Sequence, residues 1–457
     1  MLTGTRWVER GERGERAESE DWGTAMTAIL ARRPVREATE LAKTTPGVLS
    51  GFLLALVVVG LLAGLFTALS VQRRAQALDD LATSSGPLTA AAQEIYRSLS
   101  DADATSTGAF LSAGLEPAQT RQRYEADIAQ ASNALAIAIA ARDPADVTAP
   151  GSPLATLSEQ LPVYTGLIET ARATNRQGLP LGAAYQREAS NLMRTRLLPA
   201  AQALYQSEND QLSADQDRAG AVPWLEILLA LVVLALLVVA QRYLSRHTNR
   251  VFNAGLLVAT AAAVVSLLWV LVSAFAARAD VGDSRTDGSA QADTLARAHI
   301  ATLNARADET LTLVARGAGQ AYQDDYVKLT RSLGTLLDGA RSAATDSAVA
   351  DRVAAAVTDT KTWTDAHVDI RGADDSGDYT TAVRLAVEQV PGGAAPAFDK
   401  VDADLRDATD RTRATFGEKI TDASGALSGT VAAVIVFAVA VAAGSAAGIW
   451  RRLKDYR

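Results

Sequence analysis

Arginine, aspartate and tyrosine side chains in two long polar segments are the residues of this chain best suited to bind a ligand or a partner. A guanidinium group donates two parallel hydrogen bonds to a carboxylate, so grouped arginines favour a carboxylate ligand. The candidate binding residues are Tyr96, Arg97, Asp101, Asp103, Arg123, Arg306 and Asp308. The alternative is that these side chains are only solvated or paired on helix faces, as most charged residues are.

Further arginines and tyrosines of the same segments offer similar chemistry. Arg187, Arg194 and Arg196 can also bind a carboxylate. Aromatic rings can stack on a ligand or cover the end of a helical bundle, and both interpretations stay open for the tyrosines. These tyrosines are Tyr124, Tyr185, Tyr326 and Tyr379.

The chain has no cysteine and only three histidines. This composition excludes disulfides, thiol nucleophiles and cysteine-based metal sites, and it leaves little for a histidine metal centre. We find no Gly-rich phosphate loop, no nucleophile elbow and no kinase signature. We therefore expect no catalytic residue, no metal and no cofactor, and we expect that the protein is not an enzyme.

The overall charge also narrows the class of partner. The chain has 44 Lys plus Arg against 52 Asp plus Glu, which gives a formal net charge of −8. A globally basic surface, which a nucleic-acid-binding protein needs, is therefore absent from the composition. We expect no nucleic acid among the partners.

Four long apolar runs organise the chain, at residues 48–71, 224–240, 253–275 and 427–450. A helix of about 20 residues crosses the ~30 Å hydrocarbon layer of a bilayer. We therefore predict an all-α membrane protein with four transmembrane helices in the lipid bilayer.

Glu226 is the one charged residue in these runs. It lies beside Trp224 in the first turn of its helix, where its carboxylate can reach water and meet the positive end of the helix dipole. The alternative is a proton or ion ligand at membrane depth.

Basic residues flank the apolar runs on one side. Because short cytoplasmic flanks are enriched in Lys and Arg, we expect both termini and the short central loop to face the cytoplasm of a multi-pass plasma-membrane protein. The expected basic cytoplasmic contacts are Arg242, Arg246, Arg250, Arg451 and Arg452.

This topology divides the chain into nine parts. We expect a cytoplasmic N-terminal segment at 1–47, disordered over 1–25, with Met1 or Met26 as the start, and a cytoplasmic tail at 451–457. The transmembrane helices are 48–71, 223–241, 251–276 and 427–450, with a basic cytoplasmic loop at 242–250. Two extracytoplasmic helical bundles occupy 72–222 and 277–426.

The two halves of the chain follow the same plan, which predicts a tandem repeat. A shift of 205 residues places Val48 on Asn253 and Asp103 on Asp308. Each outer segment carries a coiled-coil-like apolar seam, from Leu78 to Ala102 in the first and from Phe398 to Ala423 in the second. Gly, Pro and Asp clusters cut each outer segment into four helical stretches, which favours two four-helix-bundle-like domains. We expect Pro87, Pro199 and Pro223 to kink or interrupt the long helices.

Small residues at i, i+4 spacing lie in two of the apolar runs. Gly60 and Gly64, and likewise Gly444 and Gly448, allow two helices to approach closely. We expect these glycines to serve helix packing within the membrane. A functional alternative is that their smooth faces let helices slide or rotate as a signal crosses the bilayer.

One local motif resembles a known family. The stretch from Tyr96 to Ala104 (YRSLSDADA), followed by Phe110-Leu111, Gly114, Glu116-Pro117 and Arg123-Tyr124, resembles the GlnX-type membrane proteins of actinobacteria. The four-helix layout with two outer domains is similar as well. This resemblance implies a nutrient-sensing role that links an extracellular amino-acid-binding lipoprotein of the GlnH type to the cytoplasmic protein kinase PknG. It implies no particular catalytic or ligand residue.

The sequence thus favours a transmembrane sensor or adaptor. Its outer bundles would bind a solute or a loaded solute-binding protein, and its helices would pass amino acid status to a cytoplasmic signalling partner. The alternatives are a transporter or channel component and a chemoreceptor-like stand-alone receptor. The sequence does not identify the ligand, and it does not decide whether the outer bundles bind that ligand directly or through a solute-binding protein. It also leaves open which cytoplasmic segment contacts the partner and which oligomeric state the protein has, although a homodimer is compatible with it.

The topology can be tested by cysteine labelling. Cysteines introduced at Ser152 and Ser376 should react with a membrane-impermeant thiol reagent on intact cells, because both positions lie in predicted outer segments. A cysteine at Ser245 should react only after the cells are opened. Labelling at Ser245 alone on intact cells would reverse the orientation.

Overall fold

The computed structural model describes residues 45–111, 116–248 and 253–454. These residues are helical or lie in short connections, without a strand among them, which confirms the predicted all-α fold. Four of the described helical runs are long and apolar enough to cross a membrane, as predicted. The expected disorder of residues 1–25 and the choice between Met1 and Met26 lie outside the described residues, as do Gly114 and Arg250.

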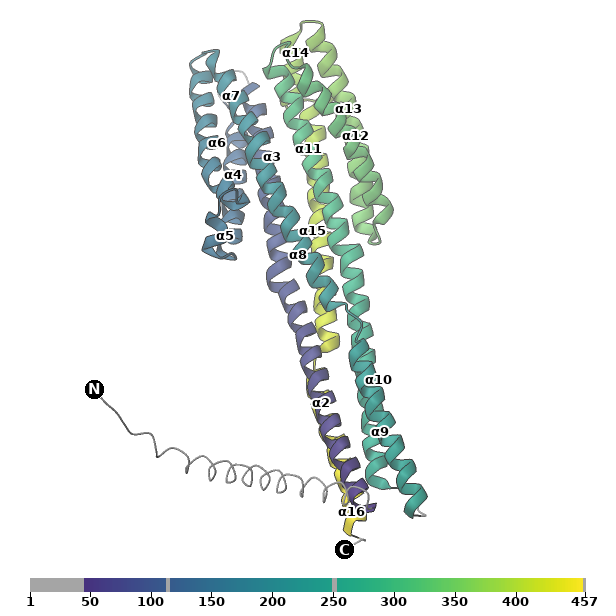
Figure 1. Cartoon of the computed structure of the whole chain (residues 1–457). Coiled ribbons are helices and arrows are strands. Elements are labelled where there is room, and N and C mark those ends of the chain that lie inside the picture. Colours follow the sequence, from purple (N-terminus) through teal and green to yellow (C-terminus); the bar gives the residue numbers. More distant parts are fainter. Residues whose placement is uncertain (1–44, 112–115, 249–252, 455–457) are drawn as a thin grey trace, which may run out of the picture. The chain divides into compact units, whose positions relative to one another are not determined.

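The chain forms two compact units (Figure 1). The first, here called the apolar unit, comprises Met1–Val71, Pro223–Val272 and Gly429–Arg457. The second, here called the polar unit, comprises Gln72–Val222 and Ser273–Ser428.

The apolar unit contains the four candidate membrane spans. They belong to α2 (Thr45–Asp80), α9 (Trp224–Thr248), α10 (Ala254–Asp283) and α16 (Thr430–Lys454). Leu56, Leu237 and Leu256 are buried in its core, whereas Leu54 and Val436 are more than half exposed. Large exposed apolar side chains on helices of this length are suited to contact lipid.

Three of the four predicted packing glycines lie at close helix crossings. A Cβ atom built on Gly64 would lie 2.4 Å from Cβ of Ala438, and one on Gly444 would lie 2.8 Å from the carbonyl oxygen of Gly255. A Cβ atom on Gly448 would lie 2.8 Å from Oδ1 of Asn253, whose amide nitrogen donates to the Gly448 carbonyl at 2.9 Å. Gly60 is less confined, because the nearest atom to its Cβ position is 3.4 Å away.

Glu226 differs from the expectation that its carboxylate reaches water. Only 6% of the residue is exposed, and its carboxylate accepts a hydrogen bond from the Ser70 hydroxyl group of α2. It also lines a cavity of about 60 Å³ within the apolar unit. The buried acid therefore connects two helices of this unit.

The basic segment between α9 and α10 is shorter than expected. Residues 242–248, which the sequence assigns to a loop, form the last turns of α9. Leu244 and the two arginines of this segment are strong helix formers, so the helix continues where the hydrophobicity ends. Arg242, Arg246 and Arg451 are described at the ends of their helices, whereas the side chain of Arg452 lies outside the description.

The first half of the polar unit is a helical bundle, here called bundle 1. It consists of η1 (Leu81–Ser85), α3 (Gly86–Leu111), α4 (Ala118–Ala140), α5 (Pro144–Thr148), α6 (Pro153–Arg176), α7 (Leu181–Leu192), η2 (Met193–Leu197) and α8 (Leu198–Ala219), where η denotes a π-helix. The helices end close to the predicted breaks. Asp143, for example, accepts a hydrogen bond from the backbone nitrogen of Ala145 at 2.9 Å and thereby caps α5.

The second half of the polar unit is bundle 2. It consists of η3 (Ser284–Ala290), α11 (Gln291–Val314), α12 (Gln320–Ala343), α13 (Ser347–Asp375), α14 (Tyr379–Val387) and α15 (Ala394–Leu427). Its connections also lie close to the predicted breaks. Both halves have a π-helix just before the first long bundle helix. This similarity accords with a tandem repeat, which stays a prediction.

The predicted seam of bundle 1 is largely buried, with one shift. Leu78, Leu81 and Leu99 are fully buried, but Thr89 takes the inward position instead of Leu88, which is only half-buried. The π-helix η1 causes this shift, because each wider turn adds one residue to the spacing. Pro87 lies two residues after the end of η1, so the wide turn accommodates the missing backbone donor and the proline ring.

The helix that enters each bundle and the helix that leaves it differ in how they connect to the candidate spans. In the chain, α2, η1 and α3 follow one another without a break, and so do α10, η3 and α11. The returning helices are interrupted. Residues 220–223 separate α8 from α9 and include Pro223, and residues 428–429 separate α15 from α16, where Gly429 adopts a φ of +73°. The interruption at Pro223 accords with the expectation for that proline, whereas the sequence indicated no break at Gly429.

The two bundles meet along α3 and α11 (Figure 1). Because each of these helices packs against its own bundle and against the other one, residues 301–314 of α11 are buried almost without exception. Leu111 of α3 belongs to the core of bundle 2. The polar unit is therefore one body with a central helix pair.

The close crossing of α10 and α16 predicts a sharp difference between two glycines. Gly448→Ala should lower the stability of the detergent-solubilised protein by about 1–3 kcal/mol, because the added methyl group overpacks the crossing. Gly51→Ala should leave it unchanged or raise it slightly, since nothing lies within 4 Å of its Cβ position. Unfolding in a denaturing detergent measures both, and equal midpoints for the two variants would contradict the crossing.

Candidate functional site

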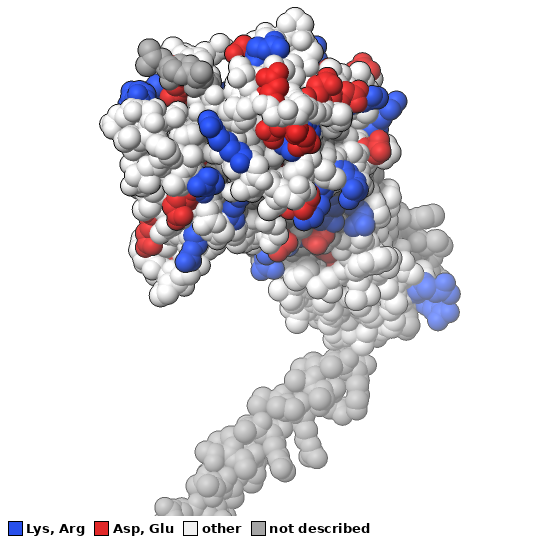
Figure 2. All heavy atoms as spheres, turned by 90° about the horizontal axis from the view of Figure 1, so that it is seen from above, with Lys and Arg blue, Asp and Glu red and all other residues white. Residues whose placement is uncertain are grey.

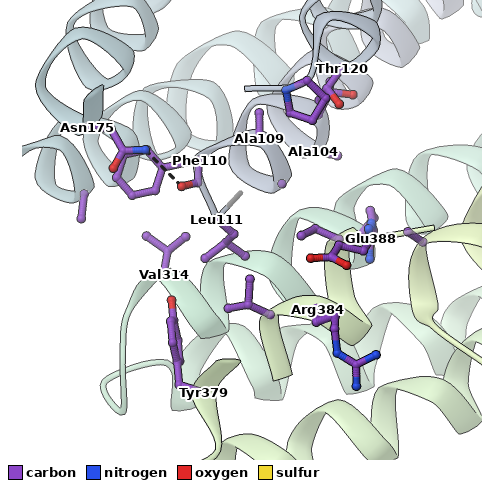
Figure 3. A pocket seen from close by; sticks show the side chains of 18 of the residues that line it. Ala104, Ala109, Phe110, Leu111, Thr120, Asn175, Val314, Tyr379, Arg384 and Glu388 are labelled. Carbon is purple, nitrogen blue, oxygen red and sulfur yellow. Dashed lines mark hydrogen bonds between the residues drawn. The ribbon is translucent and has the colours of Figure 1, made fainter. Parts of the chain in front are cut away.

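A large cleft lies between the two bundles of the polar unit. Its volume is about 1710 Å³, and both bundles contribute to its walls. Bundle 1 supplies the ends of α3 and α6 and the start of α4 (Figure 3), together with the first part of α7. Bundle 2 supplies the end of α11, α14 and the start of α15. The turns that end these helices therefore place the cleft at one end of the helix pair α3 and α11.

Arginine is the dominant charged residue of the cleft. Its only acidic lining residues among those described are Glu388 and Asp399. The arginines are Arg123, Arg176, Arg187, Arg306, Arg316 and Arg384. The cleft thus has an excess of positive charge in a chain with a net charge of −8.

Four of these arginines have no ionic partner among the described residues. Arg176 and Arg187 of bundle 1 and Arg316 and Arg384 of bundle 2 are exposed, and none forms an ion pair with a described acid. Figure 2 shows that basic and acidic side chains are otherwise interspersed over this part of the surface. Unpaired guanidinium groups on both walls can bind an anion.

Arg316 has a backbone conformation that side chains rarely adopt. Its φ is +45°, in the left-handed region that costs a non-glycine residue roughly 1–3 kcal/mol. Its guanidinium carbon lies 4.8 Å from the centre of the Tyr379 ring, and the Tyr379 hydroxyl group donates to the Leu313 carbonyl at 3.2 Å. The turn after α11 therefore directs a cation towards the cleft at a conformational cost.

The cleft also has an apolar part. Phe110, Leu111 and Val314 lie together where α3 and α11 end (Figure 3), and Val383 and Val387 of α14 line the same space. Asn175 fixes the end of α3 by donating to the Phe110 carbonyl at 3.3 Å (Figure 3). A ligand with charged ends and an apolar body matches this lining.

A buried ion-pair cluster lies beside the cleft and joins the bundles. Arg123 of α4 donates to Asp101 of α3 at 2.9 Å and, across the interface, to Asp402 at 3.0 Å and Asp399 at 3.2 Å on α15. Asp402 also accepts from Arg406 at 3.0 Å and contacts His299 at 2.5 Å. Arg123 therefore holds acids from both bundles.

The pKa values of this cluster are shifted in opposite directions. Burial alone would raise the pKa of Asp402, but its hydrogen bond with His299 and the charges of Arg123 and Arg406 hold it well below the usual range. Burial raises the pKa of Asp127 to about 8, and the negative charge of Asp101 adds to the shift. Asp127 is thus the protonated member of the cluster near neutral pH.

A second polar cluster also crosses the interface between the bundles. Arg194 of η2 pairs with Asp308 of α11, and its guanidinium carbon lies 5.4 Å from the centre of the Tyr322 ring. Burial raises the pKa of Asp308 to about 6. Asp103 lies nearby on α3, where it accepts from Ser190 at 2.8 Å and its pKa is raised by burial.

Arg306 belongs to a polar network inside bundle 2. It pairs with Glu309 and donates to the Ala386 carbonyl at 2.7 Å. Glu309 also accepts from Trp363 at 3.2 Å and contacts His367 at 3.0 Å. These partners satisfy the buried carboxylate, which indicates a structural role for this network.

The seven candidate residues from the sequence do not form one site. Arg123 and Arg306 line the cleft, and both are paired. Arg97 and Asp101 belong to the cluster around Arg123, while Asp103 and Asp308 lie near Arg194. Tyr96 is half-buried against Asn304 of α11.

Sequence reasoning found part of the cleft and missed the rest. It singled out Arg187 and Tyr379, which line the cleft, whereas Tyr124 and Tyr326 are buried in the bundle cores. It missed Arg176, Arg316 and Arg384 because none of them belongs to a periodic pattern. The available signal was that Arg176 and Arg316 directly precede Gln-Gly and Gly at predicted helix breaks.

Comparison with known proteins identifies one matching family. A family model described as an actinobacterial sensor domain matches residues 77–217. This range covers bundle 1, from the last turn of α2 into α8. No curated protein and no solved structure matches the chain. The match supports an actinobacterial sensor protein.

The buried Asp127 predicts a pH-dependent stability. Its pKa is raised in the folded state, so the folded protein retains a proton that the unfolded chain releases above about pH 4, and stability should fall as pH rises from about 4 to 8. The charged groups around it are Asp101 and Arg97 on α3, Arg123 on its own helix and Arg406 on α15. Asp127→Asn should remove this part of the decline.

The measurement is thermal unfolding of the full chain in detergent between pH 5 and 8.5. Asp127→Asn should raise the melting temperature more at pH 8 than at pH 5. Asp210→Asn is the matched control, because Asp210 is exposed on α8 and forms no ion pair with a described residue. An equal effect of the Asp127 substitution at both pH values would contradict the shifted pKa.

Proposed function

We propose that this protein is a transmembrane sensor or adaptor that relays extracellular amino acid status to a cytoplasmic signalling partner. In this proposal the polar unit faces the outside of the plasma membrane, both termini face the cytoplasm, and an amino-acid-binding lipoprotein delivers the signal to the polar unit. The cytoplasmic partner is a protein kinase, as the family resemblance implies.

One observation carries the proposal. The two helices that meet between the bundles and end at the cleft, α3 and α11, are the helices that continue without a break into α2 and α10. A ligand or partner that changes the spacing of α3 and α11 would therefore act on two candidate spans directly. Buried, close-packed helices transmit such a shift because they have few alternative arrangements.

The family match supports the sensing part of the proposal. It assigns bundle 1 to a class of sensor domains, and bundle 1 supplies one wall of the cleft. The basic residues at the far ends of α9 and α16, such as Arg246 and Arg451, offer a surface for an acidic cytoplasmic partner.

The stand-alone receptor is the second candidate, and the cleft favours it. Unpaired arginines on both walls can bind a small anion without a lipoprotein. A transporter or channel component has a weaker basis in the structure, because the cavity found in the apolar unit holds only about 60 Å³.

The proposal predicts an amino-acid-dependent complex. The purified full chain in detergent should capture an amino-acid-binding lipoprotein, and loading with the amino acid should change the affinity about 5- to 150-fold, the usual range for coupled sites. By reciprocity, the captured lipoprotein should bind its amino acid more tightly or more weakly by the same factor. Calorimetry on the two components measures both affinities.

The other outcomes distinguish the alternatives. Binding of amino acids to the full chain with no capture of a lipoprotein would favour the stand-alone receptor. Substrate flux into proteoliposomes that contain this chain alone would overturn both sensing versions and favour a transporter.

A further inference from the structure

We propose that the cleft between the bundles binds an extended organic dianion, whose two acidic groups pair with arginines on opposite walls. This inference deepens the proposed function by naming the ligand class of the polar unit. The binding itself requires neither the lipoprotein nor the cytoplasmic partner, so the two proposals can fail separately.

The positions of the unpaired arginines indicate that the ligand carries two acidic groups. Arg176 and Arg187 lie on bundle 1 at the end of α6 and on α7, whereas Arg316 and Arg384 lie on bundle 2 after α11 and on α14. A ligand with one carboxylate would satisfy one wall and leave the cations of the other wall unpaired. A dianion satisfies both walls and screens their mutual repulsion.

Two other arginines of the cleft differ from these four, because acids of the same unit pair with them. Arg123 is held by Asp101, Asp399 and Asp402, and Arg306 is held by Glu309. The interface therefore neutralises its buried cations internally. Within the part of the chain that the structure describes, no acid forms an ion pair with the exposed cations at the mouth, although Glu388 and many other acids belong to the same unit.

The size and lining of the cleft indicate an extended ligand. Pockets for small ligands usually enclose about 300–1,000 Å³, whereas this cleft holds about 1710 Å³. A compact dianion would leave the exposed apolar surface of the half-buried Phe110, Val383 and Val387 in water. A chain of methylene groups between the two acids would cover that surface, at about 0.8 kcal/mol for each buried CH₂ group.

The strain at Arg316 is independent support. Its left-handed backbone and its position over Tyr379 direct the guanidinium group towards the cleft at an energetic cost. Residues kept in such conformations concentrate at binding sites, where the strain pre-organises a contact. Gly317, with a φ of +87°, follows in the same turn and completes the reversal of the chain.

A ligand that bridges the walls would also act on the central helix pair. Leu111 and Val314 are the last residues of α3 and α11 that line the cleft, and they come from opposite bundles. Pairing of both arginine groups with one ligand would favour a closed arrangement of these helix ends. This step links binding to the relay proposed above.

The test uses dicarboxylates of increasing length on the full chain in lipid nanodiscs. The probes are succinate, adipate and suberate, with butyrate, hexanoate and octanoate as monocarboxylate controls and empty nanodiscs as the blank. Calorimetry should show binding that strengthens from succinate to suberate. Each dicarboxylate should bind about 10-fold or more tightly than the monocarboxylate of equal length, because it gains a second charge-assisted contact.

Substitutions on both walls check the bridge. Arg176→Gln and Arg384→Gln should each weaken suberate binding about 10- to 100-fold. Arg196→Gln in bundle 1 and Arg331→Gln in bundle 2 are matched controls, since both arginines are exposed outside the cleft and should leave binding unchanged. Equal melting temperatures of all four variants would show that the fold is intact.

Three results would overturn the inference. They are no binding of any probe, equal binding of monocarboxylates and dicarboxylates, and loss of binding from one wall only. Amino-acid-dependent capture of a lipoprotein without dicarboxylate binding would reject the ligand class and leave the sensor function standing.

Discussion

The contact between α3 and α11 is the constraint on which the rest of the polar unit depends. Both helices pack on two sides, so polar side chains on them must find partners inside the interface or cost several kcal/mol each. Arg123 meets this requirement by holding Asp101 of its own bundle together with Asp399 and Asp402 of the other. Loss of Arg123 would remove its ion pairs with Asp101, Asp399 and Asp402 at once, so one side chain ties the interface to one edge of the cleft.

The interface is specific because its charges are not symmetric. Under the 205-residue shift of the predicted repeat, Asp101 corresponds to Arg306, and Arg194 corresponds to Asp399. In both buried clusters that cross the interface, bundle 1 supplies an arginine and bundle 2 supplies the acid. Asp308 corresponds to Asp103 under the same shift, so two copies of bundle 2 would place two acids at the position of the Arg194–Asp308 pair. This charge difference disfavours pairing of bundle 2 with itself.

The sequence predicts the elements well because they depend on local signals. Unbroken apolar runs mark the four candidate spans, and Gly, Pro and Asp clusters mark the helix ends. It predicts side-chain partners poorly because these come from distant residues. Arg306 and Asp308 were grouped as one candidate site, yet a helix turns about 100° per residue, so one points into bundle 2 and the other to Arg194. The π-helix η1 shifts the seam to Thr89 with no signal in the apolar pattern beyond Pro87.

The chain enters each bundle through a continuous helical run and leaves it through an interrupted one. A break at Gly429 or before Pro223 lets a helix change its angle without moving its neighbour in the chain, because the linking residues absorb the change in φ and ψ. The continuous runs through η1 and η3 lack such a joint, although a π-helical turn can shift its register by one residue. Gly288 of η3 supports this role, since a Cβ atom built on it would lie 2.9 Å from Cβ of Phe416 on α15. The packing there leaves no room for a larger side chain, so a rotation of α11 would have to displace that ring. The cleft-lining helices α3 and α11 are therefore joined in the chain to α2 and α10 through η1 and η3 without an intervening loop.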